Sequence, residues 1–311
     1  MTENDFLRHL KTRYPATPFV DVGIGDDGAV LVPQSRPQVV VTDLLLDGVH
    51  FDLNRTSARL AGRKAMAVNL SNLAAMGCRP TAAFVSIAVP KQPPGAPSSD
   101  FLMDLYRGFD ELTLEFNFAI AGGDTNSWNG PFAVNVCLIG IPFAASGRCL
   151  LRSTAQPGDT LLVSGSLGGS LTHDRHLTFA PRLALSEWLS NRDGIHAAMD
   201  ISDGLSTDLL RMMEASRVAA VVESARVPIH VDVPADLAPQ RRLAAAMSDG
   251  EDFELLLSVS SEHADRLVHD AAATGFQLFE IGRVEADGES ILIKYDGQVE
   301  VLRSTGWQHS M

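Results

Sequence analysis

The pattern of apolar and polar positions predicts strands and helices that follow one another along the whole chain. Val39–Leu46 is apolar and β-branched, which is typical of a buried strand. Residues 57–76 are rich in alanine and leucine, and the length of this run favours a helix. The same pattern predicts strands at 82–89, 118–121, 132–141, 160–164, 253–259 and 291–294, and helices from a cap at Asp100 to about residue 115, at 179–189 and at 205–215.

A stretch of small residues at 144–147 separates two such series of elements. The chain has 311 residues, which is long for one ordinary domain and suits two. We therefore expect an α/β (α+β) fold with two domains, at residues 1–148 and 149–311. With a hydrophobic composition of 45%, each domain can form its own core.

Composition excludes several classes of protein. The three cysteines, Cys78, Cys137 and Cys149, fit no disulfide or zinc spacing, so we expect a reducing, cytoplasmic location. The N-terminal residues do not read as a signal peptide, and no apolar run approaches the roughly 18 residues of a membrane span. The net charge is −13 and no basic cluster is visible, so we expect neither a nucleic-acid nor a membrane partner.

The acidic residues gather beside glycine or small hydroxyl residues where predicted strands end. The first such motif, Gly-Ile-Gly-Asp-Asp-Gly at 23–28, pairs Asp26 and Asp27, whose mutual repulsion a metal ion would relieve. In the second, an apolar strand leads into Thr42 and Asp43. In the third, a predicted buried strand leads into Gly-Gly-Asp-Thr at 122–125, whose N–H groups could hold phosphate oxygens. Each is equally open to explanation as a turn or a cap.

Two further clusters lie in the second half. Asp200, Asp203 and Asp208 surround a predicted strand-to-helix turn, where Asp203 is also a candidate helix cap. The segment 249–254 places three more acids just before an apolar strand.

Five acid-glycine clusters spread over both halves are hard to explain as coincidence. Mg²⁺ prefers oxygen ligands, usually one or two carboxylates together with phosphates and water. Phosphoryl transfer requires positioning and charge neutralisation, for which Arg152 or Lys64 offers direct cationic help. The chain has no Walker A loop, so this would not be a P-loop enzyme.

The order of the motifs resembles that of the thiamine-monophosphate kinases, which belong to the aminoimidazole ribonucleotide synthetase superfamily. The resemblance runs from about residue 23 to 254, with a weaker match at Gly306-Trp307. It rests on GIGDD, TD followed by His50 and Phe51, the helix KAMAVNLSxLAAMG, GGDT, RSxAxPGD, DISDGLxxDL and GEDFEL.

The resemblance implies an N-terminal half with a mixed sheet that pairs in a homodimer to form a shared barrel, and a C-terminal α+β layer. It implies ATP as co-substrate, in a cleft between the halves, with several Mg²⁺ ions, and direct transfer to thiamine phosphate. The implied catalytic residues are Asp43, Asp124 and Asp203. The implied Mg²⁺ ligands are Asp27, Thr42, Asp43, Asn72, Asp124, Asp200 and Asp203. The implied ATP contacts are Gly123, Asp124, Arg152, Ser202 and Tyr106, and the implied thiamine-phosphate contacts are His50, Glu251 and Trp307.

The sequence departs from the family pattern at several positions. Asn72 stands where the family helix has Asp, so one ligand offers a carbonyl oxygen without a charge. Asn126, Asp249 and the residues after Trp307 differ as well. Three hypotheses stay open: an active kinase, another ATP-dependent enzyme of the superfamily, and a relative that binds these ligands but has lost catalysis. For Trp307, packing as a C-terminal anchor is an equal alternative to ring stacking on thiamine.

Overall fold

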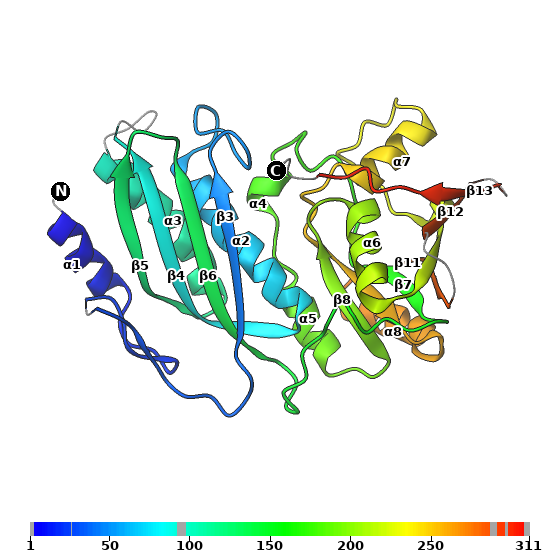
Figure 1. Cartoon of the computed structure of the whole chain (residues 1–311), viewed down its shortest axis with the longest axis horizontal. Coiled ribbons are helices and arrows are strands. Elements are labelled where there is room, and N and C mark those ends of the chain that lie inside the picture. Colours follow the sequence, from blue (N-terminus) through cyan, green and yellow to red (C-terminus); the bar gives the residue numbers. More distant parts are fainter. Residues whose placement is uncertain (1–2, 26, 92–97, 287–290, 296–297, 308–311) are drawn as a thin grey trace. The chain divides into compact units, whose positions relative to one another are not determined.

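The computed structural model describes residues 3–25, 27–91, 98–286, 291–295 and 298–307, so Asp26 of the first acidic motif lies outside the described residues. The chain divides into two compact units (Figure 1). The first comprises residues 1–73 and 78–147. The second comprises residues 148–311 together with Ala74–Gly77, a short piece that lies inside the predicted first domain.

The first unit is built on a four-stranded mixed sheet with the strand order β3-β6-β4-β5. Its strands β3 and β6 are antiparallel, as are β6 and β4, whereas β4 and β5 run parallel. The unit contains α1 (Glu3–Arg13), β1 (Val20–Val22), β2 (Val30–Leu31), β3 (Val39–Leu46), α2 (Ala58–Ala75), β4 (Cys78–Pro90), α3 (Ser98–Glu115), β5 (Ala119–Trp128) and β6 (Ala133–Pro142).

Helices α2 and α3 pack very closely because glycines stand where they meet. A Cβ atom at Gly62 of α2 would lie 2.2 Å from the Leu105 carbonyl oxygen, and one at Gly108 of α3 would lie 1.9 Å from the Arg59 carbonyl oxygen. Glycine removes the side chain that would otherwise separate the two backbones. Along β3 the exposure alternates, with Val40 and Leu44 facing away from these helices at 61% and 54% exposed.

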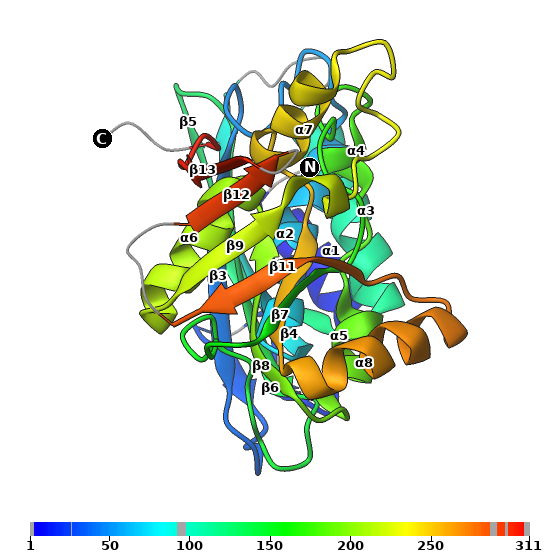
Figure 2. The same ribbon diagram turned by 90° about the vertical axis from the view of Figure 1, so that its right-hand side faces the viewer.

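The second unit is built on a seven-stranded sheet with the order β13-β12-β9-β11-β7-β10-β8. Figure 2 shows β12, β9 and β11 side by side in this sheet. The β12–β9 pair is parallel, while β10 pairs antiparallel with both β7 and β8. The strands are β7 (Thr160–Val163), β8 (Ile195–Ile201), β9 (Ala219–Glu223), β10 (Glu254–Val259), β11 (Phe279–Glu285), β12 (Ile291–Tyr295) and β13 (Gln298–Leu302).

Apolar side chains of α6 pack with those of β7 to β12 to form the core of this unit. Leu205, Leu209 and Met212 of α6 are completely buried there, against Leu256 and Val222 of the sheet. The helical segments of the unit are α4 (Arg175–Thr178), α5 (Leu183–Ser190), α6 (Leu205–Ser216), the 3₁₀ helix η1 (Ser224–Arg226), α7 (Pro239–Ser248) and α8 (Ser261–Ala273).

The long predicted elements are confirmed, but several predicted ends are wrong. Helix α3 begins at Ser98, so Asp100 lies in its first turn and is not its cap. The predicted strand at 118–121 continues to Trp128, because residues 122–128 remain paired with β4. The predicted helix at 179–189 begins only at Leu183. No helix among the described residues is long and apolar enough to cross a membrane.

Candidate functional site

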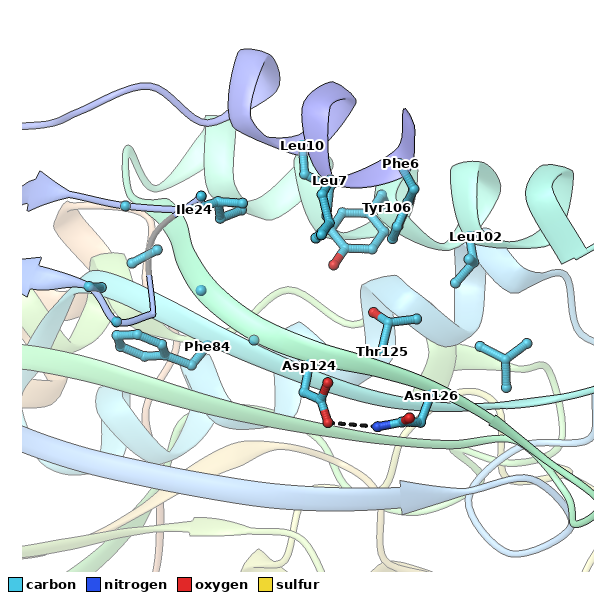
Figure 3. A pocket seen from close by; sticks show the side chains of 18 of the residues that line it. Phe6, Leu7, Leu10, Ile24, Phe84, Leu102, Tyr106, Asp124, Thr125 and Asn126 are labelled. Carbon is cyan, nitrogen blue, oxygen red and sulfur yellow. Dashed lines mark hydrogen bonds between the residues drawn. The ribbon is translucent and has the colours of Figure 1, made fainter. Parts of the chain in front are cut away.

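A pocket of about 1000 Å³ lies in the first unit, between the outer strand β5, the glycine-rich residues 23–25 and 27–29, and helices α1 and α3 (Figure 3). One part of its wall is apolar and comes from Phe6, Leu7, Leu10 and Leu102. The other part is polar and glycine-rich. It includes Gly23, Gly25, Asp27, Gly28 and the β5 residues Gly122 to Ser127, and the lining also contains Lys91 and the apolar side chains of Ile24, Phe84 and Val89. The pocket therefore offers different chemistry at its two sides.

Strand β5 carries the Gly-Gly-Asp-Thr motif inside a regular strand, so the expected turn is absent. Gly122, Gly123 and Asp124 pair in parallel register with Phe84, Val85 and Ser86 of β4. A Cβ atom at Gly123 would lie 1.9 Å from the Val85 carbonyl oxygen, so only glycine fits this register. Because β5 is the last strand of the sheet, its other edge faces the pocket with backbone groups that the sheet does not use.

Amide side chains hold the predicted ligands of the first unit in place. Asn126 Nδ2 donates a hydrogen bond to Asp124 Oδ2 (2.8 Å), drawn as the dashed line in Figure 3. Asn72 Nδ2 donates to Asp43 Oδ2 (2.5 Å). Each amide group neutralises no charge but fixes the orientation of the carboxylate that it contacts.

Strand β3 places Thr42 and Asp43 on opposite faces of the sheet, in mid-strand and not at a strand end. Asn135 Nδ2 of β6 donates hydrogen bonds to Thr42 Oγ1 (2.9 Å) and to the Asp43 carbonyl oxygen (3.2 Å). Asp43 aligns across the sheet with Gly123, through Val136 and Val85. Since side chains alternate along a strand, Asp43 and Asp124 point to opposite faces of the sheet.

Tyr106 of α3 is buried beside the pocket, and its hydroxyl points into the space below α1 (Figure 3). Its ring packs edge-to-face on Phe6 and Phe109, with centroids 5.5 and 5.1 Å away. Burial raises the pKa of Tyr106 far above its usual range, so the hydroxyl stays protonated at neutral pH and remains a hydrogen-bond donor.

The turn after β3 carries His50, and a buried lysine holds it. His50 Nδ1 accepts a hydrogen bond from the Leu46 N–H (3.0 Å), which places the proton of the neutral ring on Nε2. Lys64 of α2 is 1% exposed and donates from Nζ to the His50 carbonyl oxygen (2.6 Å). Lys64 is therefore part of the interior that shapes this turn, and the direct cationic help suggested for it by the sequence stays a prediction.

In the second unit, a tight turn between β8 and α6 presents Ser202 and Asp203. The carboxylate of Asp208 accepts hydrogen bonds from the N–H groups of both residues, each 2.9 Å long. Helix α6 is capped by Gly204, with no side-chain cap, so the capping role predicted for Asp203 is wrong. Asp203 Oδ2 instead accepts from Arg211 Nη1 (2.5 Å), which also donates to Asp208.

Two more chain segments contact this turn and bring two of the predicted substrate residues, Glu251 and Trp307, to it. The Glu251 N–H donates to the Ser202 carbonyl oxygen (2.7 Å), and the Trp307 N–H donates to the Asp203 carbonyl oxygen (3.0 Å). Glu251 adopts a left-handed backbone with φ of 58°, which costs free energy in a residue other than glycine and is common at functional sites. Trp307 is 54% exposed, so the alternative of a buried C-terminal anchor is wrong.

Negative charge is concentrated at this turn. The pKa of Asp208 is raised to about 7, mainly by burial and also by the charges of Asp203 and Asp200, while the backbone N–H bond and Arg211 act in the opposite direction. Asp200 lies inside β8, paired with Leu255, and is 7% exposed, so it is not just beyond a strand end as predicted. Arg152, also in this unit, is exposed, and its carbonyl oxygen accepts from Ser216.

The oxygen groups of the predicted site residues are chemically suited to Mg²⁺. They are carboxylate, hydroxyl and amide oxygens, which are the ligands that this ion prefers. Within the described part of the chain, no group of three or more acidic, histidine or cysteine side chains is arranged to hold a metal ion. The residues therefore fit an ion that one or two carboxylates share with a phosphate group, and not a site made of protein ligands alone.

Comparisons with known proteins agree with this picture. Residues 25–142 match the family model of the AIR synthase related protein, N-terminal domain, and residues 172–294 match the model of its C-terminal domain. The thiamine-monophosphate kinase of Rhodopirellula baltica is 38% identical over 292 residues, which cover 91% of this chain and 89% of the relative. The thiamine-monophosphate kinase of Bacillus subtilis is 32% identical over 334 residues, which cover 99% of this chain and 99% of the relative.

The chain belongs to the thiamine-monophosphate kinase family. Among solved structures, the thiamine-monophosphate kinase of Stenotrophomonas maltophilia is 32% identical, with a TM-score of 0.79 and coverage of 94% of this chain and 95% of that one. The protein AaThiL, solved in complex with AMPPCP and TMP, is 26% identical, with a TM-score of 0.74 and coverage of 99% and 97%. A hydrogenase maturation protein solved with ATP shares the fold at 20% identity and a TM-score of 0.73.

Among the residues predicted from the thiamine-monophosphate kinase pattern, the structure brings Asp27, Gly123, Asp124 and Tyr106 to one pocket. It brings Ser202, Asp203, Glu251 and Trp307 to one turn of the second unit. The pattern gave no indication of Asn126, Asn135 or Arg211, which hold these residues in place. Of these three residues, Arg211 has a signal in the sequence, because it follows Asp208 by three positions on α6 and both side chains therefore lie on one face of the helix.

Asp208→Asn should destabilise the second unit by about 2–4 kcal/mol, because an amide cannot accept from both N–H groups and also pair with Arg211. Urea unfolding measures this loss, and hydrogen exchange should show faster exchange at the amides of Ser202 and Asp203. Asp193→Asn, at an exposed position, serves as the control and should stay within about 0.5 kcal/mol of the parent. Equal stability of both variants would contradict the role assigned to Asp208.

Proposed function

We propose that this protein transfers the γ-phosphoryl group of ATP to thiamine phosphate, giving ADP and thiamine diphosphate. The observation that carries the proposal is the pocket of the first unit, where Asp27, Gly123, Asp124 and Tyr106 line one space. Support comes from curated thiamine-monophosphate kinases at 38% and 32% identity over nine-tenths or more of this chain. Further support comes from the related AaThiL, which was solved with AMPPCP and TMP.

The two sides of the pocket match the two parts of a nucleoside triphosphate. The apolar wall and the Tyr106 ring suit a base and sugar. Residues 23–25 and 27–28 and the outer edge of β5 offer backbone N–H groups for phosphate oxygens, and glycine allows close approach. Of the other proposed nucleotide contacts, Ser202 and Arg152 belong to the second unit.

Mg²⁺ would be held by Asp27, Asp43, Asp124, Asp200 and Asp203, with Thr42 and Asn72 as neutral oxygen ligands. When bound, such ions neutralise the charge of the phosphate groups. Asn126 orients Asp124 and Asn72 orients Asp43, and because the two carboxylates point to opposite faces of the sheet, they would hold different ions. Asp203 would have to exchange its contact with Arg211 for the ion.

The acceptor would lie against His50, Glu251 and Trp307. The Leu46 N–H donates to His50 Nδ1 and thereby orients the imidazole ring. The exposed indole of Trp307 offers an aromatic face to a cationic thiazolium ring. The reaction then needs no covalent intermediate on the protein, because positioning and charge neutralisation suffice for phosphoryl transfer.

A product assay with ATP, Mg²⁺ and thiamine phosphate tests the proposal, with thiamine diphosphate measured by chromatography after oxidation to a fluorescent form. The parent protein should form product. Asp124→Ala and Asp43→Ala should lower kcat by at least about a hundredfold, since each removes a charge that the transition state requires. Asp21→Ala, which removes an exposed acid outside the pocket lining, is the matched control and should retain activity. No product from the parent, or full activity of both variants, would overturn the proposal.

A second candidate function, binding of these ligands without efficient catalysis, is favoured by one observation only. Asn72 lies 2.5 Å from the Asp43 carboxylate and donates to it, where the family pattern has a second carboxylate.

Asn72→Asp distinguishes the two candidates. Without divalent cations, the two carboxylates would repel each other, so the variant should have a lower Tm than the parent, and Mg²⁺ should restore it. If the parent is an active kinase that uses the amide, turnover should change by less than about threefold. A large gain in turnover would instead show that the parent is catalytically impaired.

We also propose that the protein is a homodimer, paired through the face of the four-stranded sheet that α2 and α3 leave open. Val40, Leu44 and Leu46 of β3 expose 61%, 54% and 37% of their surface there. A row of exposed apolar side chains on a sheet is typical of an interface.

ATP and thiamine phosphate are the proposed small-molecule partners. The cytoplasmic location, and the absence of nucleic-acid and membrane partners, remain predictions from composition.

Leu44→Asp should convert the dimer to a monomer in light scattering, because it would place paired charges in an apolar interface. Leu114→Asp, on α3 with the residue 81% exposed, is the control and should leave the dimer intact. A parent protein that is monomeric at micromolar concentration would contradict the proposed dimer.

A further inference from the structure

Helix α1 is attached to α3 by a stripe of three residues spaced four apart. Phe6, Leu10 and Tyr14 are buried, and the Phe6 ring packs on Tyr106 of α3. The Tyr14 hydroxyl donates to Asp110 (2.5 Å), and Arg13 forms an ion pair with the same carboxylate. These contacts fix α1 along the edge of the pocket.

A second face of α1, beside this stripe, is turned toward the pocket. Leu7 lines the pocket, yet 43% of its surface is exposed (Figure 3). Lys11, one turn further along, lies against Gly25 of the glycine-rich segment. A Cβ atom at Gly25 would be 2.9 Å from both Cδ and Nζ of Lys11. Residues four apart share a helix face, so α1 brings an apolar side chain and a cation to the same site.

The position of each side chain matches the chemistry of the pocket near it. Leu7 lies with Phe6, Leu10 and Leu102 in the apolar part of the lining. Lys11 lies over the segment that carries Gly25 and Asp27, in the glycine-rich part. A half-exposed leucine gains free energy when a ligand covers it, and an ammonium group attracts phosphate oxygens.

We propose that α1 is part of the nucleotide-binding site, with Leu7 packing against the base or sugar and Lys11 attracting the phosphate groups at the Gly25 segment. This inference rests on the proposed function, because it assigns additional binding residues to the same nucleoside triphosphate. It gives Leu7 a role that depends on the nucleoside and gives Lys11 a role that depends on the phosphates.

Two probes separate these roles: AMPPCP, which carries both nucleoside and phosphates, and inorganic tripolyphosphate, which carries phosphates alone. Binding of each to the full chain is measured by calorimetry in the presence of Mg²⁺. Leu7→Gln should weaken AMPPCP binding about fivefold and leave tripolyphosphate binding unchanged. Lys11→Met should weaken both probes about threefold, and the effect should shrink at high salt.

The chain offers matched controls for both variants. Arg8 lies on α1, has a largely exposed side chain and pairs with Asp5, so Arg8→Met removes the same charge from the same helix without touching the pocket lining. Leu114→Gln changes an exposed leucine of α3 outside the lining. Neither control should alter the binding of either probe. Leu7→Met, which keeps an apolar side chain of similar volume, should restore AMPPCP binding if Leu7→Gln acts through lost packing.

Several outcomes would overturn the inference. If Leu7→Gln weakens tripolyphosphate as much as AMPPCP, its effect runs through the fold and not through the nucleoside. If Lys11→Met and Arg8→Met behave alike, the charge of Lys11 acts only at long range. Failure of the parent protein to form thiamine diphosphate, with these binding differences intact, would instead count against the proposed reaction and leave α1 as a nucleotide-binding element.

Discussion

A carboxylate that binds a phosphate group through a metal ion must already be oriented before the ion binds. This constraint applies in both units. In the first unit, amide groups of Asn72 and Asn126 hold Asp43 and Asp124. In the second, Arg211 holds Asp203. An amide leaves the carboxylate charged, whereas a guanidinium group neutralises it. At the contacts with Asn72 and Asn126 the carboxylates of the first unit therefore keep their charge, while Asp203 in the second unit must exchange one cationic partner for another.

The same constraint explains where the acids lie along the chain. The glycine and hydroxyl neighbours of Asp43, Asp124 and Asp200 predicted turns, yet all three residues lie within strands. A strand fixes both neighbours of a carboxylate through the hydrogen-bond ladder, which positions it better than a loop does. For Asp43 the strand predicted at 39–46 already extended past the acid, but the sequence could not show that strands continue through Asp124 and Asp200, because glycines and acids have low strand propensity and only pairing with β4 and β10 overrides it.

Long apolar strands and helices, such as Val39–Leu46 and the helix around Asn72, were predictable because their periodicity is strong. The family motifs predicted which acids form the site, and that assignment stays a prediction. Neither route indicated α1, whose stripe of Phe6, Leu10 and Tyr14 is short and lies outside the motifs. Nor did either indicate Asn135, whose role depends on hydrogen bonds to Thr42 and Asp43 of a different strand. Local patterns carry no information about such long-range pairs.

The outer strand β5 shows how stability and binding depend on one another here. A free strand edge invites pairing with another chain, and proteins usually cover it. Here the edge is bordered by α1 and the 23–29 segment, which leave about 1000 Å³ between them and the strand. Gly123 keeps β5 tight against β4, so the backbone at the pocket is rigid. Because α1 and the glycine-rich residues cover the edge of β5 without pairing with it, they shield the sheet from pairing with another chain. The N–H groups of this edge stay available to a ligand. The position of α1, held by its contacts with α3, thus serves both the fold and the proposed binding site.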